Sequence, residues 1–406
     1  MSIRPPFGTA LGIRGRDYAA VAAHGEVITN SALLRAVEWP EVDPTGEPVR
    51  SPRRLDAELR ALVLESAVTP RFSWERFLDR HRADGPAERL LALLNHRAFQ
   101  FNSRAAFGGA VSPWRARVEA CVREGRRLEV VLPAFCVIGN PVKRFDLTAA
   151  TAAEDVALLH LANLAELLGR LHEPGAVFHI ISDSTFYGSP FGVTSVEAVN
   201  YVAELRERIR ELDLGRVLRL HDMSDVLQPV VPQFQRRFDA WFRALRLDRC
   251  ADGISADEHD RWLTSMMASI DIRKLGLSYA ELRATYLDRG EHFHGIRERA
   301  RWALNEYRAM KLAATDLEWE ELAFPGAVRA TIHTKSIPVL GLRIFPEYKF
   351  SARLLPYHGI GVLSRSVKTG RYRMGVRPEM FVHGRPDMRR IVDERGITSF
   401  YLHCPQ

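Results

Sequence analysis

The sequence predicts an α/β fold: a Rossmann-like central sheet with a βαβ core, joined to a largely helical N-terminal region. Leu128–Pro133 and Ala176–Ile181 are short apolar runs of the kind that form buried strands. Between them, Asp155–Leu171 repeats leucine and valine at the spacing of one helix face. Strand, helix and strand in this order form a βαβ unit, so we expect the two strands to be adjacent and parallel.

The chain of 406 residues is long enough for two structural units, or for one large α/β domain with an elaborated N-terminus. Residues 1–126 are predicted to form a mixed, mostly helical N-terminal region, in which Arg53–Glu65 places leucines at helical spacing. Residues 127–406 are predicted to form an α/β catalytic domain. Its later elements are expected at Val196–Leu212 (helix), Arg216–Leu220 (strand), Gln233–Leu247 and Tyr279–Thr315 (helices), and Ala327–His333, Lys349–Leu354 and Gly359–Ser364 (strands of the same sheet).

Composition narrows the function classes. Hydrophobic residues make up 46% of the chain and charged residues 26%, as in an ordinary globular protein. The net charge of +7 comes from dispersed arginines and not from a basic run, so nucleic-acid binding is not expected. The excess of positive charge suits an anionic, phosphorylated substrate.

The N-terminus lacks a signal-peptide pattern and no stretch is long and apolar enough to span a membrane, so we expect a soluble, cytoplasmic protein without membrane partners. Four dispersed cysteines without a CxxC pair argue against a cysteine zinc site and against a disulfide scaffold.

Chemistry is expected where the strands end, because ligands of open α/β sheets bind beyond the C-terminal ends of the strands. The segment after the first strand contains Asn140 and ends in Lys143-Arg144, and the segment after the second strand begins Ser182-Asp183-Ser184. Each has a plain structural alternative: the two cations fit a solvated loop end, and Asp183 fits the N-cap of a turn or helix. Their positions after two adjacent parallel strands favour a shared site.

A third group of polar residues lies late in the chain. Arg329 and His333 alternate along one predicted strand and therefore share a face, Lys349 precedes another strand, and His358 closes the next segment. A single histidine is usually structural, but two histidines beside Arg and Lys favour a functional role. Templates for metalloproteases, serine hydrolases, ATP loops and dinucleotide loops are missing from the sequence, and His292-Phe293-His294 fits a helix surface better than a metal site. We therefore expect no metal and no cofactor.

The order of these motifs resembles that of the isonitrile synthases and their dityrosine-pathway relatives, the pyoverdine/dityrosine biosynthesis family. Each motif is weak alone, but the series in order is fairly specific. It runs from Leu128 to Pro378 and comprises Leu132-Pro133-Ala134-Phe135, Asn140-Pro141-Val142-Lys143, Glu173-Pro174-Gly175-Ala176, Ile181-Ser182-Asp183, Phe324–His333, the Lys349 strand and Leu355–Ile360.

The resemblance implies a reaction in which the α-amine of an amino acid condenses with the C2 carbonyl of ribulose 5-phosphate, whose C2 carbon becomes the isonitrile carbon without metal or organic cofactor. Yeast relatives instead make a formyl-tyrosine precursor of dityrosine. Such a condensation needs proton transfers and an anion site for the phosphate. We therefore predict catalytic roles for Asp183, His333 and His358, and substrate binding by Asn140, Lys143, Ser182, Arg329 and Lys349. An oxygenase acting downstream is a candidate pathway partner.

Three positions depart from the family pattern. Ser184 stands where the family usually has glycine, Cys136-Val137-Ile138 stands for Pro-Phe-Lys, and Tyr357 stands for tryptophan. These changes bear on the choice of amino acid and on the handling of the sugar phosphate. The sequence leaves open an isonitrile synthase, a diverged relative that performs N-formylation or another amine–carbonyl condensation, and a non-catalytic binding protein. The intact polar residues of the three segments argue against the last.

Overall fold

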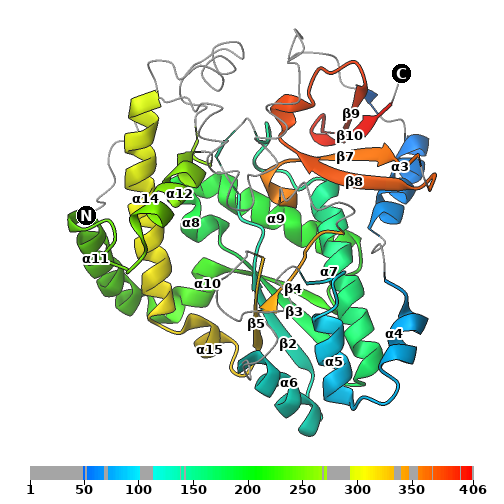
Figure 1. Ribbon diagram of the computed structural model, residues 1–406. Helices are drawn as coiled ribbons and strands as arrows, with labels where there is room; N and C mark the ends of the chain where they lie inside the picture. Colours follow the sequence, from blue (N-terminus) through cyan, green and yellow to red (C-terminus); the bar gives the residue numbers. More distant parts are fainter. Residues whose placement is uncertain are drawn as a thin grey trace.

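Two five-stranded sheets, each covered by helices, form the part of the chain that the computed structural model describes (Figure 1). The described residues are 49–50, 53–67, 72–100, 113–137, 139–140, 143–267, 269–271, 293–332, 340–346, 355–367, 369–393 and 395–404. The strands are β1 (Val49–Arg50), β2 (Leu128–Pro133), β3 (Ala176–Ser182), β4 (Leu218–Asp222), β5 (Val328–Thr331), β6 (Leu340–Gly341), β7 (Ile360–Arg365), β8 (Tyr372–Arg377), β9 (Met388–Val392) and β10 (Thr398–His403). The α-helices are α3 (Arg53–Ser66), α4 (Trp74–Arg80), α5 (Pro86–Leu94), α6 (Pro113–Arg123), α7 (Ala152–Leu171), α8 (Ser184–Phe191), α9 (Ser195–Glu211), α10 (Met223–Leu227), α11 (Val231–Leu247), α12 (Ala256–Met267), α14 (Phe293–Thr315) and α15 (Trp319–Ala323), and the 3-10 turns are η2 (Gln228–Val230), η4 (Pro356–His358) and η5 (Glu379–Phe381).

The first sheet is parallel throughout and has the strand order β4-β3-β2-β5-β6. Pro133 at the end of β2 pairs with Ile181 near the end of β3. The predicted βαβ unit is therefore confirmed, with β2 and β3 adjacent and parallel. Along the chain, β3 and β4 are added on one side of β2 and β5 on the other. The direction of winding thus reverses between β2 and β5, which is where open α/β sheets bind their ligands.

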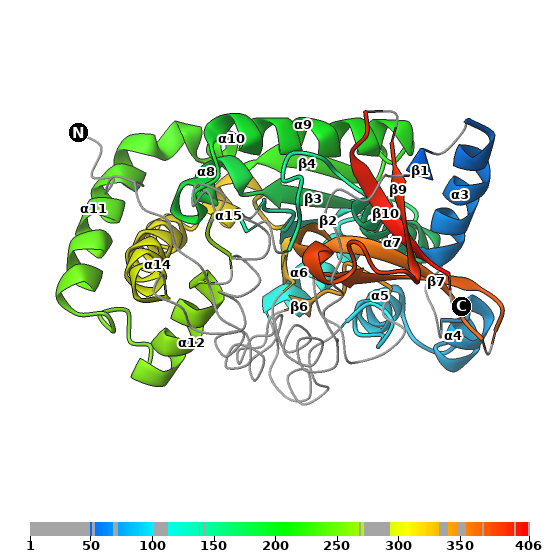
Figure 2. The same cartoon turned by 90° about the horizontal axis from the view of Figure 1, so that it is seen from above.

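Opposite faces of this sheet are covered by different helices, because successive side chains of a strand point to opposite sides. Val130 and Ile180 pack in one apolar cluster with α5, α6, α7 and α9. Val131 and Ile181 pack in another cluster with α10, α11, α14 and α15. Figure 2 shows α11, α12 and α14 at the opposite end of the molecule from α3 and α4. The sheet is buried on both faces, as its continuous apolar strands predict.

Helix α7 begins at a capping box. The Thr151 side chain accepts from the backbone of the first turn, and the Glu154 carboxylate accepts from the backbone N–H of Thr151. The start of the helix at Ala152, three residues before the predicted one, follows from this cap, which the apolar periodicity alone did not show. Buried leucines and alanines then line the helix as far as Leu168.

The second sheet combines the last part of the chain with an early strand, in the order β1-β9-β10-β7-β8 (Figure 1). It is mixed: β7 pairs antiparallel with β8 and parallel with β10. Helix α3 covers it, since Leu59 and Val63 pack with Leu363, Met374 and Phe400. The N-terminal region is thus tied to the C-terminal sheet through α3 and to the parallel sheet through α5 and α6.

The prediction that all late strands join one sheet is wrong for Gly359–Ser364, which forms β7 of the second sheet. Its Leu363 side chain finds its apolar partners on α3, β8 and the start of α7, which a strand pattern by itself cannot identify. The strand predicted from Ala327 does join the first sheet, as β5 beside β2. Lys349–Leu354 and the first part of Tyr279–Thr315 lie outside the described residues. No helix in the described ranges has the length and apolar character needed to cross a bilayer.

His160 on α7 is a polar group in the apolar core. It is fully buried, and its ring lies 5.5 Å from the ring of Phe99. Burial, assisted by the nearby charge of Arg343, lowers the pKa of His160 to about 3. The folded protein therefore keeps this imidazole neutral at mildly acidic pH, where the unfolded chain protonates it.

Replacing His160 with glutamine is expected to weaken the acid dependence of stability. Because the folded pKa of His160 is depressed to about 3, its contribution to stability is present above pH ~6.5 and is lost as the pH falls from there towards the folded value. Between pH 7 and pH 5 this residue should cost the wild-type protein about 2 kcal/mol of unfolding free energy, a loss that His160→Gln does not suffer. Urea unfolding at the two pH values measures the difference. Equal losses in both proteins would contradict the assignment.

Candidate active site

Two serines fix the start of the loop after β2: Ser182, the last residue of β3, and Ser184, the first residue of α8. Phe135 is fully buried and has a φ of 64°, a left-handed conformation that only glycine adopts freely. Its carbonyl accepts the hydroxyls of Ser182 (2.9 Å) and Ser184 (3.2 Å). The Ser184 hydroxyl also accepts the backbone N–H of Val137 at 3.0 Å. Ser182 and Ser184 therefore hold the backbone of Phe135 and Val137, the two neighbours of Cys136.

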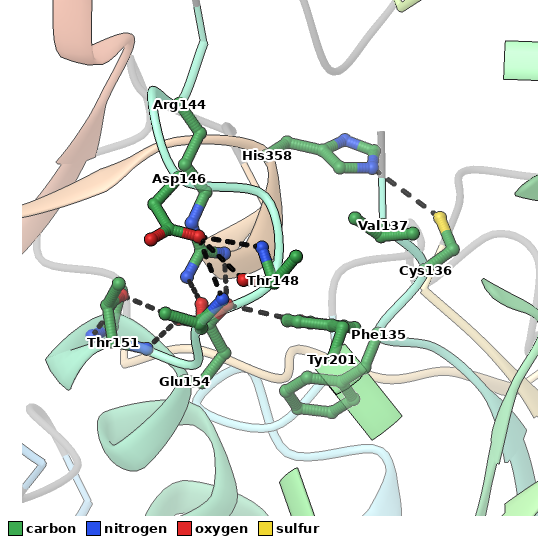
Figure 3. A network of polar contacts seen from close by, with 12 residues as sticks. Phe135, Cys136, Val137, Arg144, Asp146, Thr148, Thr151, Glu154, Tyr201 and His358 are labelled. Carbon is green, nitrogen blue, oxygen red and sulfur yellow. Dashed lines mark hydrogen bonds and ion pairs between the residues drawn. The ribbon is translucent and has the colours of Figure 1, made fainter. Parts of the chain in front are cut away.

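The left-handed turn brings this loop against the C-terminal motif. The Phe135 ring packs on the ring of Tyr357 in η4, with centroids 5.3 Å apart. The next side chain, Cys136, places its Sγ 3.6 Å from Nε2 of His358 (Figure 3). Segments that are more than two hundred residues apart in sequence, numbered 135–136 and 357–358, thus meet at the C-terminal edge of the parallel sheet.

Lys143 and Asn140 lie inside the protein. Asn140 is fully buried and Lys143 is 2% exposed, which excludes the alternative of a solvated loop end. The backbone carbonyl of Asn140 accepts the N–H of Lys143 at 3.1 Å, and the Lys143 Nζ donates to the Ser269 hydroxyl at 3.5 Å. Gly139 allows the loop to lie close to the end of α8, because a Cβ at this position would lie 2.5 Å from the carbonyl oxygen of Phe191. The loop after β2 is thus packed against the segments that follow α8 and α12.

Arg144 is the centre of a buried polar network (Figure 3). Its guanidinium forms an ion pair with Glu154 at 2.5 Å and donates to the carbonyl of Ala149. The Glu154 carboxylate also accepts the hydroxyls of Thr151 (2.6 Å) and Tyr201 (3.1 Å). Burial lowers the pKa of Arg144, but Glu154, Tyr201 and Glu379 together outweigh burial, and the pKa is raised. One charged pair in the core therefore joins the loop after β2 to the first turn of α7.

The second sheet closes on the same loop through Glu379. Its Oε2 accepts the backbone N–H of Phe145 at 2.7 Å, and its own N–H donates to the carbonyl of Lys143 at 3.0 Å. Burial raises the pKa of Glu379. The side chain sits in η5, so the C-terminal part of the chain fixes the backbone that carries the predicted cation.

A second polar group surrounds Asp183, which precedes α8. Asp183 occupies the N-cap position of that helix, as the structural alternative expects, but its side chain makes no capping hydrogen bond. Burial raises the pKa of Tyr187 well above its usual value, and the nearby Tyr307 and Asp183 raise it further, whereas Arg329 opposes them. The rings of Tyr187 and Tyr307 meet edge to face at 5.1 Å. Asp183, Tyr187 and Arg329 therefore lie within electrostatic range of one another.

Arg329 projects from β5 towards this group. Its Nε donates to Glu320 at 2.7 Å, and the side chain is 38% exposed. Burial lowers the pKa of Arg329, while Glu320, Tyr187 and Asp183 raise it. The guanidinium thus pairs with one carboxylate of α15 and lies within electrostatic range of Asp183.

Residues of the three predicted segments are linked through the hydrogen bond of Ser182 to Phe135, the approach of Cys136 to His358, and the electrostatic interaction of Asp183 with Arg329. Ser182 is fully buried and donates to Phe135, so its hydroxyl positions the loop. His333 and Lys349 lie outside the described residues. The sequence reasoning missed the following participants: Tyr187, Ser269, Tyr307, Glu320 and Glu379. Tyr187 alone carried a signal, since it lies one helical turn after Asp183.

A scan of known families matches residues 118–374 to the model described as pyoverdine/dityrosine biosynthesis protein. The chain belongs to this family. The chain is also similar to an isocyanide synthase and to a protein of solved structure. It is 31% identical over 115 residues to isocyanide synthase xanB from Aspergillus fumigatus, a match that spans 27% of this chain and only 15% of that much longer protein. The crystal structure of PvcA from Pseudomonas aeruginosa has a TM-score of 0.58 and 19% identity, over 79% of this chain and all of that one.

The matched region of this chain contains β2, β3, β5, η4 and the loop after β2. The family match therefore coincides with the elements that meet around Cys136 and Asp183. In the described part of the chain, no cluster of three or more His, Cys, Asp or Glu side chains is arranged to hold a metal ion.

Removing the charge of Glu154 tests the network that holds the loop. Glu154→Gln leaves Arg144 buried opposite a neutral partner, and the unfolding free energy is expected to fall by about 3 kcal/mol. Glu166→Gln is the matched control, because Glu166 pairs with Arg216 at 2.5 Å while their side chains are 47% and 76% exposed. An exposed pair is worth at most about 1 kcal/mol. Urea unfolding at pH 7 gives both values, and equal effects would show that the buried pair does not hold the loop.

Proposed function

We propose that this protein is an isonitrile synthase that acts on an amino acid. It joins the α-amine to the C2 carbonyl of ribulose 5-phosphate and converts that carbon into the isonitrile carbon, as part of secondary-metabolite biosynthesis. Membership of the pyoverdine/dityrosine family and the similarity to an isocyanide synthase support the proposal. The fold shared with PvcA is consistent with it.

The observation that supports the proposal most is the presence of ionisable side chains beside the segments that follow β2 and β3. Asp183 and Arg329 provide opposite charges that lie within electrostatic range, and His358 lies against the loop after β2. Amine–carbonyl condensation needs a neutral amine, a polarised carbonyl and repeated proton transfers. Carboxylate, phenol and imidazole groups supply these transfers from the protein's own side chains.

We assign the roles from the chemistry of each group. Arg329 binds the amino acid carboxylate, because a planar guanidinium can engage both of its oxygens. Asp183 holds the ammonium group and accepts its proton. Lys143 binds the phosphate as a point charge, and His358 moves protons near neutral pH. Tyr187 acts as a neutral hydrogen-bond donor, since its pKa is raised by burial.

The experiment that tests the reaction follows the C2 carbon. The purified protein is incubated with ribulose 5-phosphate carrying carbon-13 at C2 and with a panel of amino acids, and the products are analysed by mass spectrometry. We expect an isonitrile product that contains the label, formed without added nucleotide or metal. Label recovered in a formamide would favour the N-formylating alternative. Absence of labelled product with every amino acid, while circular dichroism shows a folded protein, would contradict both reactions.

Lys143→Met is expected to raise the KM for ribulose 5-phosphate by about 10- to 100-fold, the effect of losing one charge-assisted hydrogen bond. Lys311→Met is the matched control, because Lys311 lies on α14 with its Nζ 4.9 Å from the ring centre of Trp262, away from the loop after β2. Steady-state kinetics with saturating amino acid give the two KM values. Unchanged KM in Lys143→Met would remove this lysine from the phosphate site.

A further inference from the structure

Cys136 lies beside His358, and the proposed reaction gives the thiol of this cysteine no role. The Sγ and Nε2 atoms are 3.6 Å apart, within the range of a hydrogen bond to sulfur. The thiol is partly exposed, whereas the imidazole is buried. A thiol beside an imidazole can transfer its proton to the ring and leave a thiolate, which is the nucleophilic form of cysteine.

Backbone strain and two hydrogen bonds hold the thiol in this position. Phe135, immediately before it, is kept in the left-handed region with a φ of 64°. The hydroxyl of Ser184 donates to the Phe135 carbonyl and accepts the Val137 N–H, so it bridges the peptide groups on both sides of Cys136. Such strain persists only where surrounding contacts enforce it. Two positions at which this chain departs from the family pattern, Cys136 and Ser184, are therefore linked through one hydroxyl.

The titratable groups around the pair come from several elements. Tyr201 on α9 interacts electrostatically with Cys136, and its pKa is raised well above the usual value by burial and by Glu154. Glu154 on α7 is neutralised by its ion pair with Arg144. The phenol and the ion pair thus add little net charge beside the thiol, and the imidazole of His358 is the group placed to take its proton (Figure 3).

We propose that Cys136 is a nucleophile activated by His358 and that it adds reversibly to the carbonyl carbon of small aldehydes and ketones. The thiol proton passes to Nε2, and the sulfur lone pair forms a carbon–sulfur bond. The π electrons of the carbonyl move to its oxygen, which takes the proton back from the imidazolium. The product is a hemithioacetal or hemithioketal, and no oxidant, leaving group or further reactant is needed. The inference stands independently of isonitrile formation.

Alkylation by iodoacetamide tests the nucleophile without any assay of turnover. The rate at each cysteine is followed by peptide mass spectrometry from pH 5 to 10 and divided by its own plateau at high pH, which removes differences in accessibility. Cys250, partly exposed, and Cys404, exposed, are internal controls. At pH 7 an ordinary thiol shows about 3% of its plateau rate, and Cys136 is expected to exceed this fraction by at least about tenfold.

The variant His358→Gln separates the pair from a merely accessible thiol. It should return the fraction at Cys136 to that of Cys404 while leaving both controls unchanged. A wild-type Cys136 profile that follows Cys404, or a profile that His358→Gln does not alter, would overturn the proposal. The wild-type profile decides the matter even where the variant folds poorly.

Glycolaldehyde, a small aldehyde without phosphate or amine, tests the class of ligand. Added at increasing concentration, it is expected to slow alkylation of Cys136 several-fold relative to Cys404, and the rate should recover after dialysis because the adduct is reversible. Equal slowing at the two cysteines would overturn the assignment to carbonyl compounds. Neither result depends on formation of an isonitrile, so a failure here is distinguishable from a failure of the proposed function.

Discussion

Placing a guanidinium in a protein core is costly unless a carboxylate and further hydrogen bonds surround it. Arg144 meets this requirement through Glu154, while Thr151 and Tyr201 satisfy the remaining acceptor positions of that carboxylate. The ion pair ties the loop after β2 to the first turn of α7. Lys143, the residue before Arg144, is buried beside this ion pair. The capping box of α7 and the shape of the site thus depend on the same carboxylate.

Further constraints on the loop come from two other parts of the chain. The end of β3 holds its start through Ser182 and Ser184, and η5 holds its later part through Glu379. The turn η5, which joins β8 to β9 of the second sheet, therefore holds a loop that lies where the winding of the first sheet reverses between β2 and β5. The groups proposed for the reaction lie on this loop and at the ends of the strands.

Much of the first sheet could be predicted from the sequence, because β2, β3 and α7 have simple apolar patterns with few alternatives. The positions of Lys143, Asp183 and Arg329 after or within parallel strands followed from the same topology. The second sheet could not be predicted, since the partner of a strand such as β7 is chosen by distant residues on α3. Tyr307 and Glu320 were missed for a similar reason: they belong to helices whose spacing carries no chemical motif and which reach the site only through folding. The left-handed Phe135 was hidden as well, because an aromatic residue gives no sign of that conformation.

The joining of early and late segments in the second sheet bears on how the molecule is made. A nascent chain emerging from the ribosome can assemble β2, α7 and β3 once their residues are available. The strands that pair with β1 and pack on α3 are synthesised much later. So are η4 and Glu379, which bonds to the backbone of the loop after β2. The loop after β2 can therefore reach its final conformation only near the end of translation. A chain released early could therefore contain a folded parallel sheet but an incomplete candidate site. The sheet forms before the segments that complete the site are synthesised.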